Sequence, residues 1–94
     1  MDNPRLSVLL PVRDAESTLH EALDSVCAQG FADFETIIVD DHSLDASMEI
    51  VASYQDDRFL PQRNPGNGLV DALNYGASVA RAEWIVRMDA DDIM

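Results

Sequence analysis

The chain has 94 residues, 47% of them hydrophobic, which suffices for one small domain with a thin core and is too short for two domains. Its 18 acidic and 6 basic residues give a formal net charge of -12, which argues against binding to nucleic acid or to an anionic lipid surface. The single cysteine, Cys27, excludes an intrachain disulfide, and no membrane-length apolar run or secretion signal is found, so the cytoplasm is the expected location.

The first two elements read as a strand followed by a helix. Residues 6–12, Leu-Ser-Val-Leu-Leu-Pro-Val, form a nearly continuous apolar run, which is typical of a strand buried on both faces. Apolar side chains then recur at helical spacing through residues 15–29 and predict a helix. Asp14 is placed to cap the start of this helix, and Gly30 is placed to end it.

Residues 34–40 predict a second buried strand, because Thr-Ile-Ile-Val leads directly into Asp40 and Asp41. Adjacent carboxylates at a strand end either belong to a ligand site or introduce the next helix through a turn and a cap, since aspartate is favoured at such positions. The sequence leaves both interpretations open. Residues 45–54 carry apolar side chains on one broad face and predict a second helix.

The next two elements are a strand and a helix. Residues 58–62 predict a weak strand, and Pro61 places it at a sheet edge because proline donates no hydrogen bond to a neighbouring strand. Residues 67–81 carry the clearest helical stripe in the chain. Its small residues would let this helix lie close to a sheet, and Gly76 is expected to serve that packing.

Residues 84–92 combine an apolar, β-branched strand with an acidic end. Trp-Ile-Val-Arg-Met predicts a buried strand and leads into Asp89, Asp91 and Asp92. Crowded carboxylates at a strand end repel one another unless a cation or hydrogen-bond donors lie among them. Because the sequence offers few basic residues for this, we expect a hard divalent cation bound by oxygen ligands, with a solvated acidic loop as the alternative.

Strand and helix alternate along the whole chain, which predicts an α/β fold with parallel strands, right-handed crossovers and helices on both faces. A doubly wound sheet of order 3-2-1-4 follows. In such sheets ligands bind beyond the carboxyl ends of the strands, where the winding direction reverses. Three polar clusters fall at these ends, namely residues 11–13, Asp40 with Asp41, and residues 89–91. Arg13 either pairs with a substrate phosphate or offsets the neighbouring carboxylates.

The sequence lacks the motifs that are typical of several other classes of site. After the first strand there is neither a G-x-G-x-x-G run nor a lysine-containing phosphate loop, so the phosphates of any nucleotide are expected to be held mainly through a metal ion. The chain lacks the paired cysteines or histidines of a zinc site. It also lacks a serine with a nearby histidine at a strand-to-helix elbow, which argues against protease and esterase chemistry.

Four sequence blocks together resemble the amino-terminal half of family-2 glycosyltransferases with the GT-A fold. In order, they are Ser-Val-Leu-Leu-Pro-Val-Arg (7–13), Phe-Glu-Thr-Ile-Ile-Val-Asp-Asp-His-Ser-Leu-Asp (34–45), Asn-Gly-Leu-Val-Asp-Ala-Leu-Asn (67–74) and Arg-Met-Asp-Ala-Asp-Asp-Ile (87–93). The resemblance implies that residues 1–94 form a Rossmann-like half-domain that binds a nucleotide-sugar donor and is truncated relative to a complete domain.

The resemblance also implies roles for the residues that end the first two strands. Pro11, Val12 and Arg13 would line the nucleotide base. Asp41 would hydrogen-bond that base, usually uracil, and Asp40 would support Asp41.

The D-x-D element implied by the resemblance consists of Asp89 and Asp91. In the family, these positions bind ribose or sugar hydroxyls and a Mn or Mg ion that bridges the diphosphate. Asp92 adds a further carboxylate, so either Asp91 or Asp92 would touch the metal.

By the same resemblance, the expected activity is inverting transfer of a sugar from a nucleoside-diphosphate sugar, with UDP as the expected nucleotide, to the hydroxyl of a saccharide or lipid-linked acceptor. The metal would stabilise charge on the leaving diphosphate, and a general base would take the acceptor proton. In the family, that base and the acceptor pocket lie in the carboxyl-terminal half. We therefore expect this chain to bind donor and metal without transferring sugar unaided. The complete enzyme is expected in the cytoplasm, with peripheral membrane association as an option.

Two other classes remain as alternatives. A non-catalytic nucleotide-binding or interaction fragment would use the same edge of the sheet without transfer. A phospho-acceptor signalling domain also has an acidic pair at a strand end, but after its first strand and with a lysine near the last, and this chain has no lysine. The fourth strand would lack the neighbours that it has in a complete enzyme. We therefore also expect self-association through this edge of the sheet.

Overall fold

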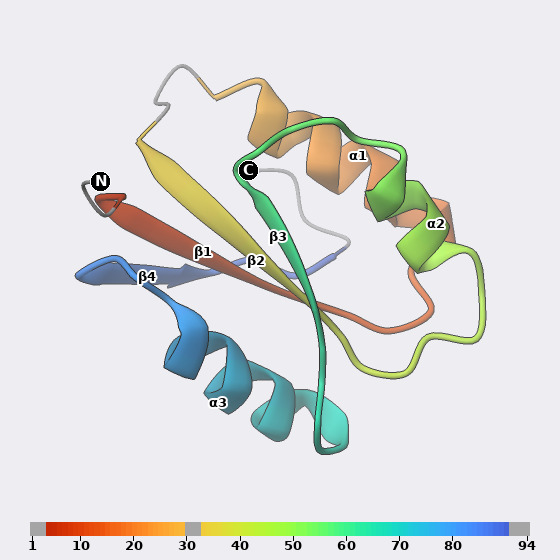
Figure 1. Ribbon diagram of the computed structural model, residues 1–94. Helices are drawn as coiled ribbons and strands as arrows, with labels where there is room; N and C mark the ends of the chain where they lie inside the picture. The colour runs from red at the N-terminus through yellow and green to blue at the C-terminus, as the bar shows by residue number, and fades with distance from the viewer. Residues whose placement is uncertain (1–3, 30–32, 91–94) are drawn as a thin grey trace.

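The computed structural model describes residues 4–29 and 33–90, in which four parallel strands alternate with three helices (Figure 1). The strands lie side by side in the order β3-β2-β1-β4, and every neighbouring pair is parallel. The predicted α/β class and the strand order 3-2-1-4 are both confirmed. In chain order, the elements are β1 (Leu6–Val12), α1 (Glu16–Cys27), β2 (Phe34–Asp40), α2 (Ser47–Ala52), β3 (Phe59–Arg63), α3 (Gly68–Val79) and β4 (Trp84–Arg87).

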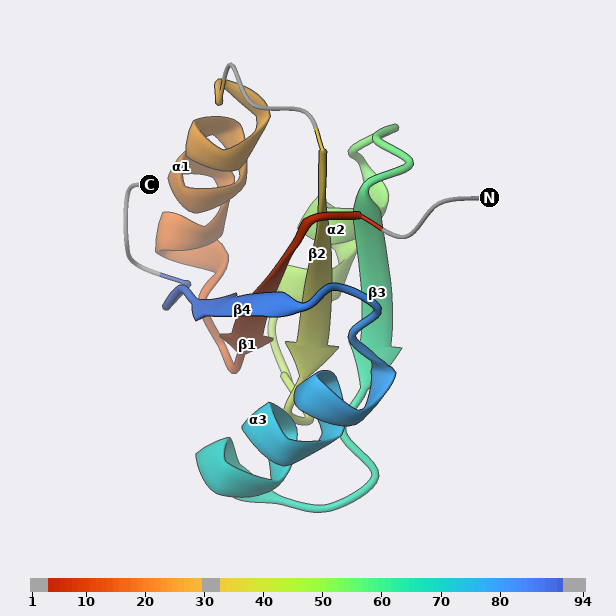
Figure 2. The ribbon, with the colours of Figure 1, turned by 90° about the vertical axis from the view of Figure 1, so that its left-hand side faces the viewer.

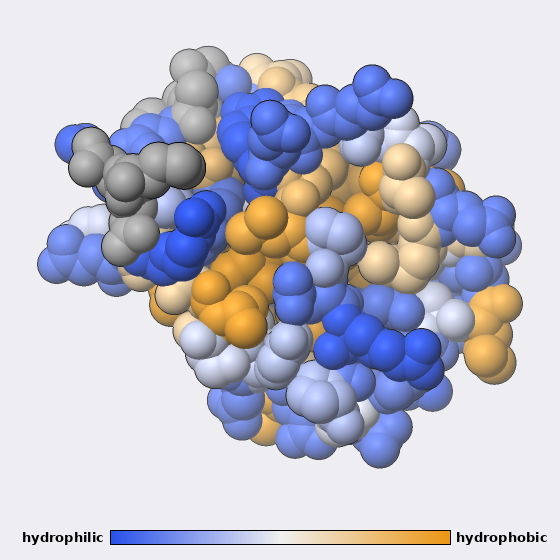
Figure 3. All heavy atoms as spheres, in the orientation of Figure 1, coloured by the Kyte–Doolittle hydropathy of each residue, from blue (hydrophilic) through white to orange (hydrophobic). Residues whose placement is uncertain are grey.

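Helices cover both faces of the sheet, as the sequence predicts. Helices α1 and α2 lie on one face and α3 lies on the other (Figure 1). Strand β1 shows why, because its side chains alternate between the two apolar clusters. Val8 and Leu10 pack with α1 and α2, whereas Leu9 packs under α3. In the space-filling view, apolar surface gathers over the strands at the centre of the face and hydrophilic residues surround it (Figure 3).

Helix α3 lies close to the sheet because Gly76 has no side chain. A Cβ atom at Gly76 would lie 3.2 Å from Cδ2 of Leu9 and 3.4 Å from Cγ2 of Val39, which is tight contact with two core residues. The predicted role of Gly76 in packing is therefore confirmed. All three helices are shorter than their apolar patterns suggest, which is common because apolar spacing continues past the last hydrogen-bonded turn.

The start of α1 is capped from a distant loop. Asp14, the predicted cap, has a φ of 48° and accepts a hydrogen bond from the amide of Leu44 at 2.7 Å, so the prediction is wrong. The amides of Ala15 and Glu16 instead donate to Ser47 Oγ at 2.9 Å and Asp45 Oδ2 at 3.1 Å. These bonds tie the start of α1 to the loop after β2 and to the first residue of α2. The predicted helix end at Gly30 lies outside the described residues.

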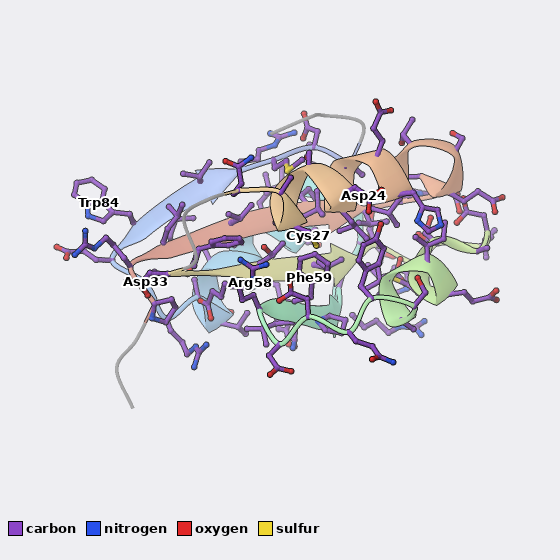
Figure 4. The ribbon with its side chains drawn as sticks, turned by 90° about the horizontal axis from the view of Figure 1, so that it is seen from above. Asp24, Cys27, Asp33, Arg58, Phe59 and Trp84 are labelled. Carbon is purple, nitrogen blue, oxygen red and sulfur yellow. The ribbon has the colours of Figure 1, made fainter. Side chains whose placement is uncertain are left out.

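Strand β4 is exposed, although the sequence predicts a buried strand. The exposed fractions of Trp84, Ile85 and Val86 are 66%, 46% and 42%. The reason is position, because β4 is the last strand of the sheet, pairs only with β1 in the described part of the chain, and contributes no side chain to either apolar cluster. Figure 2 shows β4 along the open side of the sheet, and Figure 4 shows Trp84 pointing away from the molecule.

A buried carboxylate fixes the other end of the sheet. Glu35, only 1% exposed, accepts hydrogen bonds from Ser7 Oγ at 2.6 Å and from the amide and Nε of Arg81, both at 2.8 Å. The amide of Ala82 donates to Ser7 Oγ at 3.2 Å. Burial raises the pKa of Glu35, but the hydrogen bonds from Arg81 and Ser7 outweigh it and lower that pKa. This network joins β1 and β2 to the segment that leads into β4.

None of the helices in the described ranges is long and apolar enough to cross a membrane.

Candidate functional site

A cleft of about 510 Å³ opens beyond the carboxyl ends of β1 and β4. The chain leaves β1 for α1 on one face of the sheet and reaches β4 from α3 on the other face, so this is the point where the winding direction reverses. The starts of both helices form its side walls. Five of the residues that the sequence predicts for the site line this cleft, namely Pro11, Val12, Arg13, Asp41 and Asp89.

Asp41 is buried in the wall of the cleft, where it caps α3. Its two carboxylate oxygens accept hydrogen bonds from the amide of Gly68 at 3.0 and 3.1 Å, and its side chain is 8% exposed. Asn67, the N-cap residue of α3, makes no capping bond with its own side chain. A carboxylate at a helix start is stabilised by the unpaired amides and the helix dipole. The predicted cap therefore exists, but it serves α3 rather than the next helix in the chain.

Asn64 holds Asp41 in place and has no counterpart in the sequence predictions. It is 1% exposed, and its Nδ2 donates to Asp41 Oδ1 at 3.1 Å and to the carbonyl of Gly68 at 3.2 Å. Its Oδ1 accepts from the amide of Gly66 at 3.0 Å. The run Asn-Pro-Gly-Asn-Gly signals a turn after β3. It does not signal the contact with a strand end 23 residues earlier.

Asp40 does not line the cleft. Its Oδ1 accepts a hydrogen bond from the amide of Ser43 at 3.1 Å, which closes a turn after β2. The turn interpretation of the acidic pair is therefore observed for Asp40. Asp40 fixes the loop that follows Asp41 rather than joining it in the cleft.

Two arginines bring positive charge to the cleft. Arg13 is 69% exposed, and its Nη1 lies 3.9 Å from Oδ2 of Asp41, so it offsets a neighbouring carboxylate. Arg87, the last residue of β4, donates from Nε at 3.0 Å and from Nη2 at 2.8 Å to Oδ1 of Asp89. One of the few basic residues of the chain therefore offsets the charge of Asp89.

The predicted metal ligands Asp91 and Asp92 lie outside the described residues. Within the ranges 4–29 and 33–90, no group of three histidine, cysteine or acidic residues is arranged to hold a metal ion. The acidic side chains that line the cleft, including Asp41 and Asp89, offer only carboxylate oxygens. This donor chemistry fits a hard cation such as Mg²⁺ or Mn²⁺ and not a thiolate-bound metal.

The sequence matches one family model and several curated proteins. The model described as "Glycosyl transferase family 2" matches residues 7–94. A PGL/p-HBAD biosynthesis glycosyltransferase of Mycobacterium bovis is 32% identical over 95 residues, covering 98% of this chain and 37% of the relative. The glycosyltransferase GlyG of Streptococcus pneumoniae is 39% identical over 93 residues, covering 95% of this chain and 31% of the relative. The chain thus spans about a third of the length of these relatives.

Solved structures share the fold. S. aureus TarS 1-349 in complex with UDP-GlcNAc has a TM-score of 0.86 and 28% identity, over 93% of this chain and 26% of that chain. The mannosyltransferase PcManGT from Pyrobaculum calidifontis, in complex with GDP-Man and Mn²⁺, has a TM-score of 0.84 and 26% identity, over 97% of this chain and 28% of that chain. The predicted resemblance is confirmed: this chain belongs to glycosyl transferase family 2, and its parallel sheet is the Rossmann-like part of the GT-A fold.

Proposed function

We propose that this chain is the donor-binding part of a glycosyltransferase that moves a sugar from a nucleoside-diphosphate sugar to an acceptor hydroxyl. The observation that carries the proposal is the cleft at the point where the winding direction reverses. Asp41, which follows β2, and Asp89, which follows β4, both line this cleft. Two solved relatives with the same fold are complexes with UDP-GlcNAc and with GDP-Man. Residues 1–94 would thus form one half of the domain, inactive in transfer without the other half.

The nucleotide base would lie against the end of β1. In this proposal, Pro11, Val12 and Arg13 line the base and Asp41 accepts a hydrogen bond from it. Uracil suits this arrangement because its N3–H is a donor and a carboxylate is purely an acceptor. Asp40 contributes by fixing the loop that follows Asp41.

The diphosphate and the sugar would lie toward the end of β4. Asp89 would accept hydrogen bonds from ribose or sugar hydroxyls, and Asp91 and Asp92 would hold a Mn²⁺ or Mg²⁺ ion. Such an ion supplies positive charge that stabilises the leaving diphosphate. In an inverting transfer, a base outside this chain would take the proton of the saccharide or lipid-linked acceptor, in the cytoplasm or at the membrane surface.

The proposal is tested by titrating the chain with UDP in the presence and absence of Mn²⁺. We expect Mn²⁺ to strengthen binding by ~10-fold or more, because the ion offsets repulsion between the diphosphate and an acidic chain. The variant Asp91→Ala should lose this gain. Asp57→Ala, which removes an exposed carboxylate from the turn before β3, is the matched control and should keep it. Binding that is absent in the parent chain, or unaltered in Asp91→Ala, would contradict the proposal.

We also propose that the open edge of β4 pairs with β4 of a second copy of this chain. The outer edge is unpaired in the described residues, and its three consecutive apolar side chains are exposed, which is the usual signature of a strand prone to pairing. A two-fold arrangement would bring identical edges together. Light scattering at high salt, which screens the net charge of -12, should detect dimers, and Val86→Lys should weaken them by ~10-fold or more. Monomers across the whole concentration range would contradict this.

A further inference from the structure

The backbone turns into the left-handed conformation directly after two residues of the proposed base site. In the described part of the chain, the non-glycine residues with a positive φ are Asp14, at 48°, and His42, at 61°. Asp14 follows Arg13 just past β1, and His42 follows Asp41 just past β2. This conformation is unfavourable for a residue with a side chain and persists only where surrounding contacts hold it. Such residues cluster at functional sites, so the contacts that hold them are informative.

The loop that follows β2 holds Asp14 in this conformation. The backbone amide of Asp14 donates to Ser43 Oγ at 3.0 Å, and its carboxylate Oδ1 accepts from the amide of Leu44 at 2.7 Å. Ser43 is fixed in turn, because its own amide donates to Asp40 Oδ1 at 3.1 Å. Asp14 therefore has one hydrogen bond through its backbone and one through its side chain to the same loop, and together they fix the turn after β1.

The two bonds fix the backbone next to Arg13 rather than adding much to folding. Both lie at an exposed surface, where a hydrogen bond gains little over the bond to water that it replaces. On the other side of Arg13, the carbonyl of Val12 accepts from the amide of Asp41 at 2.8 Å. Arg13 thus lies between two anchored residues, and both Asp14 and Arg13 line the cleft.

We propose that Asp14 is a positioning residue of the donor site, which fixes the turn after β1 so that Arg13 lies where the nucleotide base binds. This inference rests on the proposed function. Arg13 depends on the turn because its side chain is 69% exposed, and its Nη1 lies 3.9 Å from Oδ2 of Asp41, a pair too open to hold it in place. If the turn were free, the ligand would have to order it, and affinity would fall.

The variants Asp14→Gly and Asp14→Asn separate positioning from charge and from stability, with UDP and Mn²⁺ as the probe. Glycine adopts left-handed backbone without strain but lacks the carboxylate, so the chain should unfold at a similar urea concentration and bind UDP ~3- to 10-fold more weakly. Asparagine also tolerates this backbone and keeps an oxygen for the amide of Leu44, so it should bind UDP within ~2-fold of the parent.

Charge alone predicts the opposite result for glycine. Both variants remove one negative charge from an acidic cleft, which by itself would make both bind the diphosphate more tightly. Asp57→Asn removes the same charge from the exposed turn before β3 and is the matched control, which should leave UDP affinity as it is.

Ser43→Ala tests the same turn from the other loop. It removes the acceptor of the Asp14 amide and should weaken UDP binding by ~2- to 5-fold. In an Asp14→Gly background, Ser43→Ala should add less than it does alone, because the turn is already free. Ser53→Ala, which removes a hydroxyl from the end of α2, is the control. Fully additive losses would mean that Asp14 and Ser43 do not hold one turn, which contradicts the inference.

Uridine, which has the base and no phosphate, shows where the effect of Asp14 acts. Asp14→Gly should weaken uridine and UDP by the same factor, because the base is common to both. A loss confined to UDP, or an Asp14→Asn chain that binds as weakly as Asp14→Gly, would overturn the inference, since the diphosphate or the ligand itself would then sense the carboxylate. A folded Asp14→Gly chain with parental or higher UDP affinity would overturn it as well. Failure of the proposed function would look different, because the parent chain would then bind no UDP.

Discussion

Asp41→Asn is expected to change the base preference of the cleft from UDP toward CDP. Uracil presents a donor at N3, which complements the carboxylate of Asp41, whereas cytosine presents an acceptor at the same atom. In the asparagine variant, the side-chain carbonyl can still accept from the amide of Gly68 and from Asn64, as Asp41 does. The new NH₂ group then faces the base and opposes an N3–H.

The expected size of this change is large because a buried polar group is left unpaired. UDP should bind ~10- to 100-fold more weakly, which is the usual cost of one mismatched buried hydrogen bond, and CDP should bind more tightly than it does to the parent. Competition between the two nucleotides in the presence of Mn²⁺ measures both effects. Folding should change by no more than about 1 kcal/mol, since a neutral cap loses only the charge at the helix start.

Asp33→Asn is the matched control, because Asp33 precedes β2 at the end opposite to Asp41 (Figure 4). It makes the same chemical change away from the cleft and should leave the preference for UDP intact. An Asp41→Asn chain that is folded and still prefers UDP to the same degree would contradict base recognition by Asp41.

Glu35→Ala is expected to lower the free energy of unfolding by about 2 to 3 kcal/mol. The variant leaves the Ser7 hydroxyl and the amide of Arg81 without their acceptor at the buried end of the sheet. Arg81 itself is 50% exposed, so its charge regains water, and the loss stays below that of a fully buried ion pair. For a domain of this size, the melting temperature should fall by roughly 10 °C or more. Arg81→Ala keeps the bonds from Ser7 Oγ and the residue-81 amide to Oε2 but removes the guanidinium donor at the buried Oε1, so it should also destabilise the chain, by about 1 to 3 kcal/mol.

The pH dependence of unfolding provides a second measure of Glu35. Because the pKa of Glu35 in the folded chain is lowered from its usual 4.5, its contribution is fully present above that pH and is lost as the pH falls through the folded-state value. Urea unfolding at pH 7 and below pH 4.5 should therefore show a larger loss of stability in the parent than in Glu35→Gln. An equal loss in both chains would mean that Glu35 does not titrate with folding.

The sequence by itself determined the order of the elements, the parallel sheet and the edge at which the cleft lies. Short, nearly continuous apolar runs predict strands, and apolar residues repeating every three to four positions predict helices. The regular succession of strand and helix then leaves essentially one handedness for each crossover. Parallel strands then bring all their carboxyl ends to one edge. That is why the sequence places Pro11, Val12, Arg13, Asp41 and Asp89 at one edge, where they line the cleft, although it places Asp40 there too and Asp40 lies outside the lining.

Only the tertiary structure decided which partner each polar side chain takes. Asp41 caps a helix that starts 27 residues later, Glu35 binds an amide 46 residues away, and Asp14 binds Leu44 instead of its own helix. Local spacing carries no signal for such contacts, because they depend on how loops from different elements pack. The exposure of β4 has the same origin, because the sequence of an apolar strand is the same whether a neighbouring element or water covers it. Burial and polar pairing depend on how the elements assemble. The direction of each strand follows from the succession of elements along the chain, and the face to which each side chain points follows from its position within the strand.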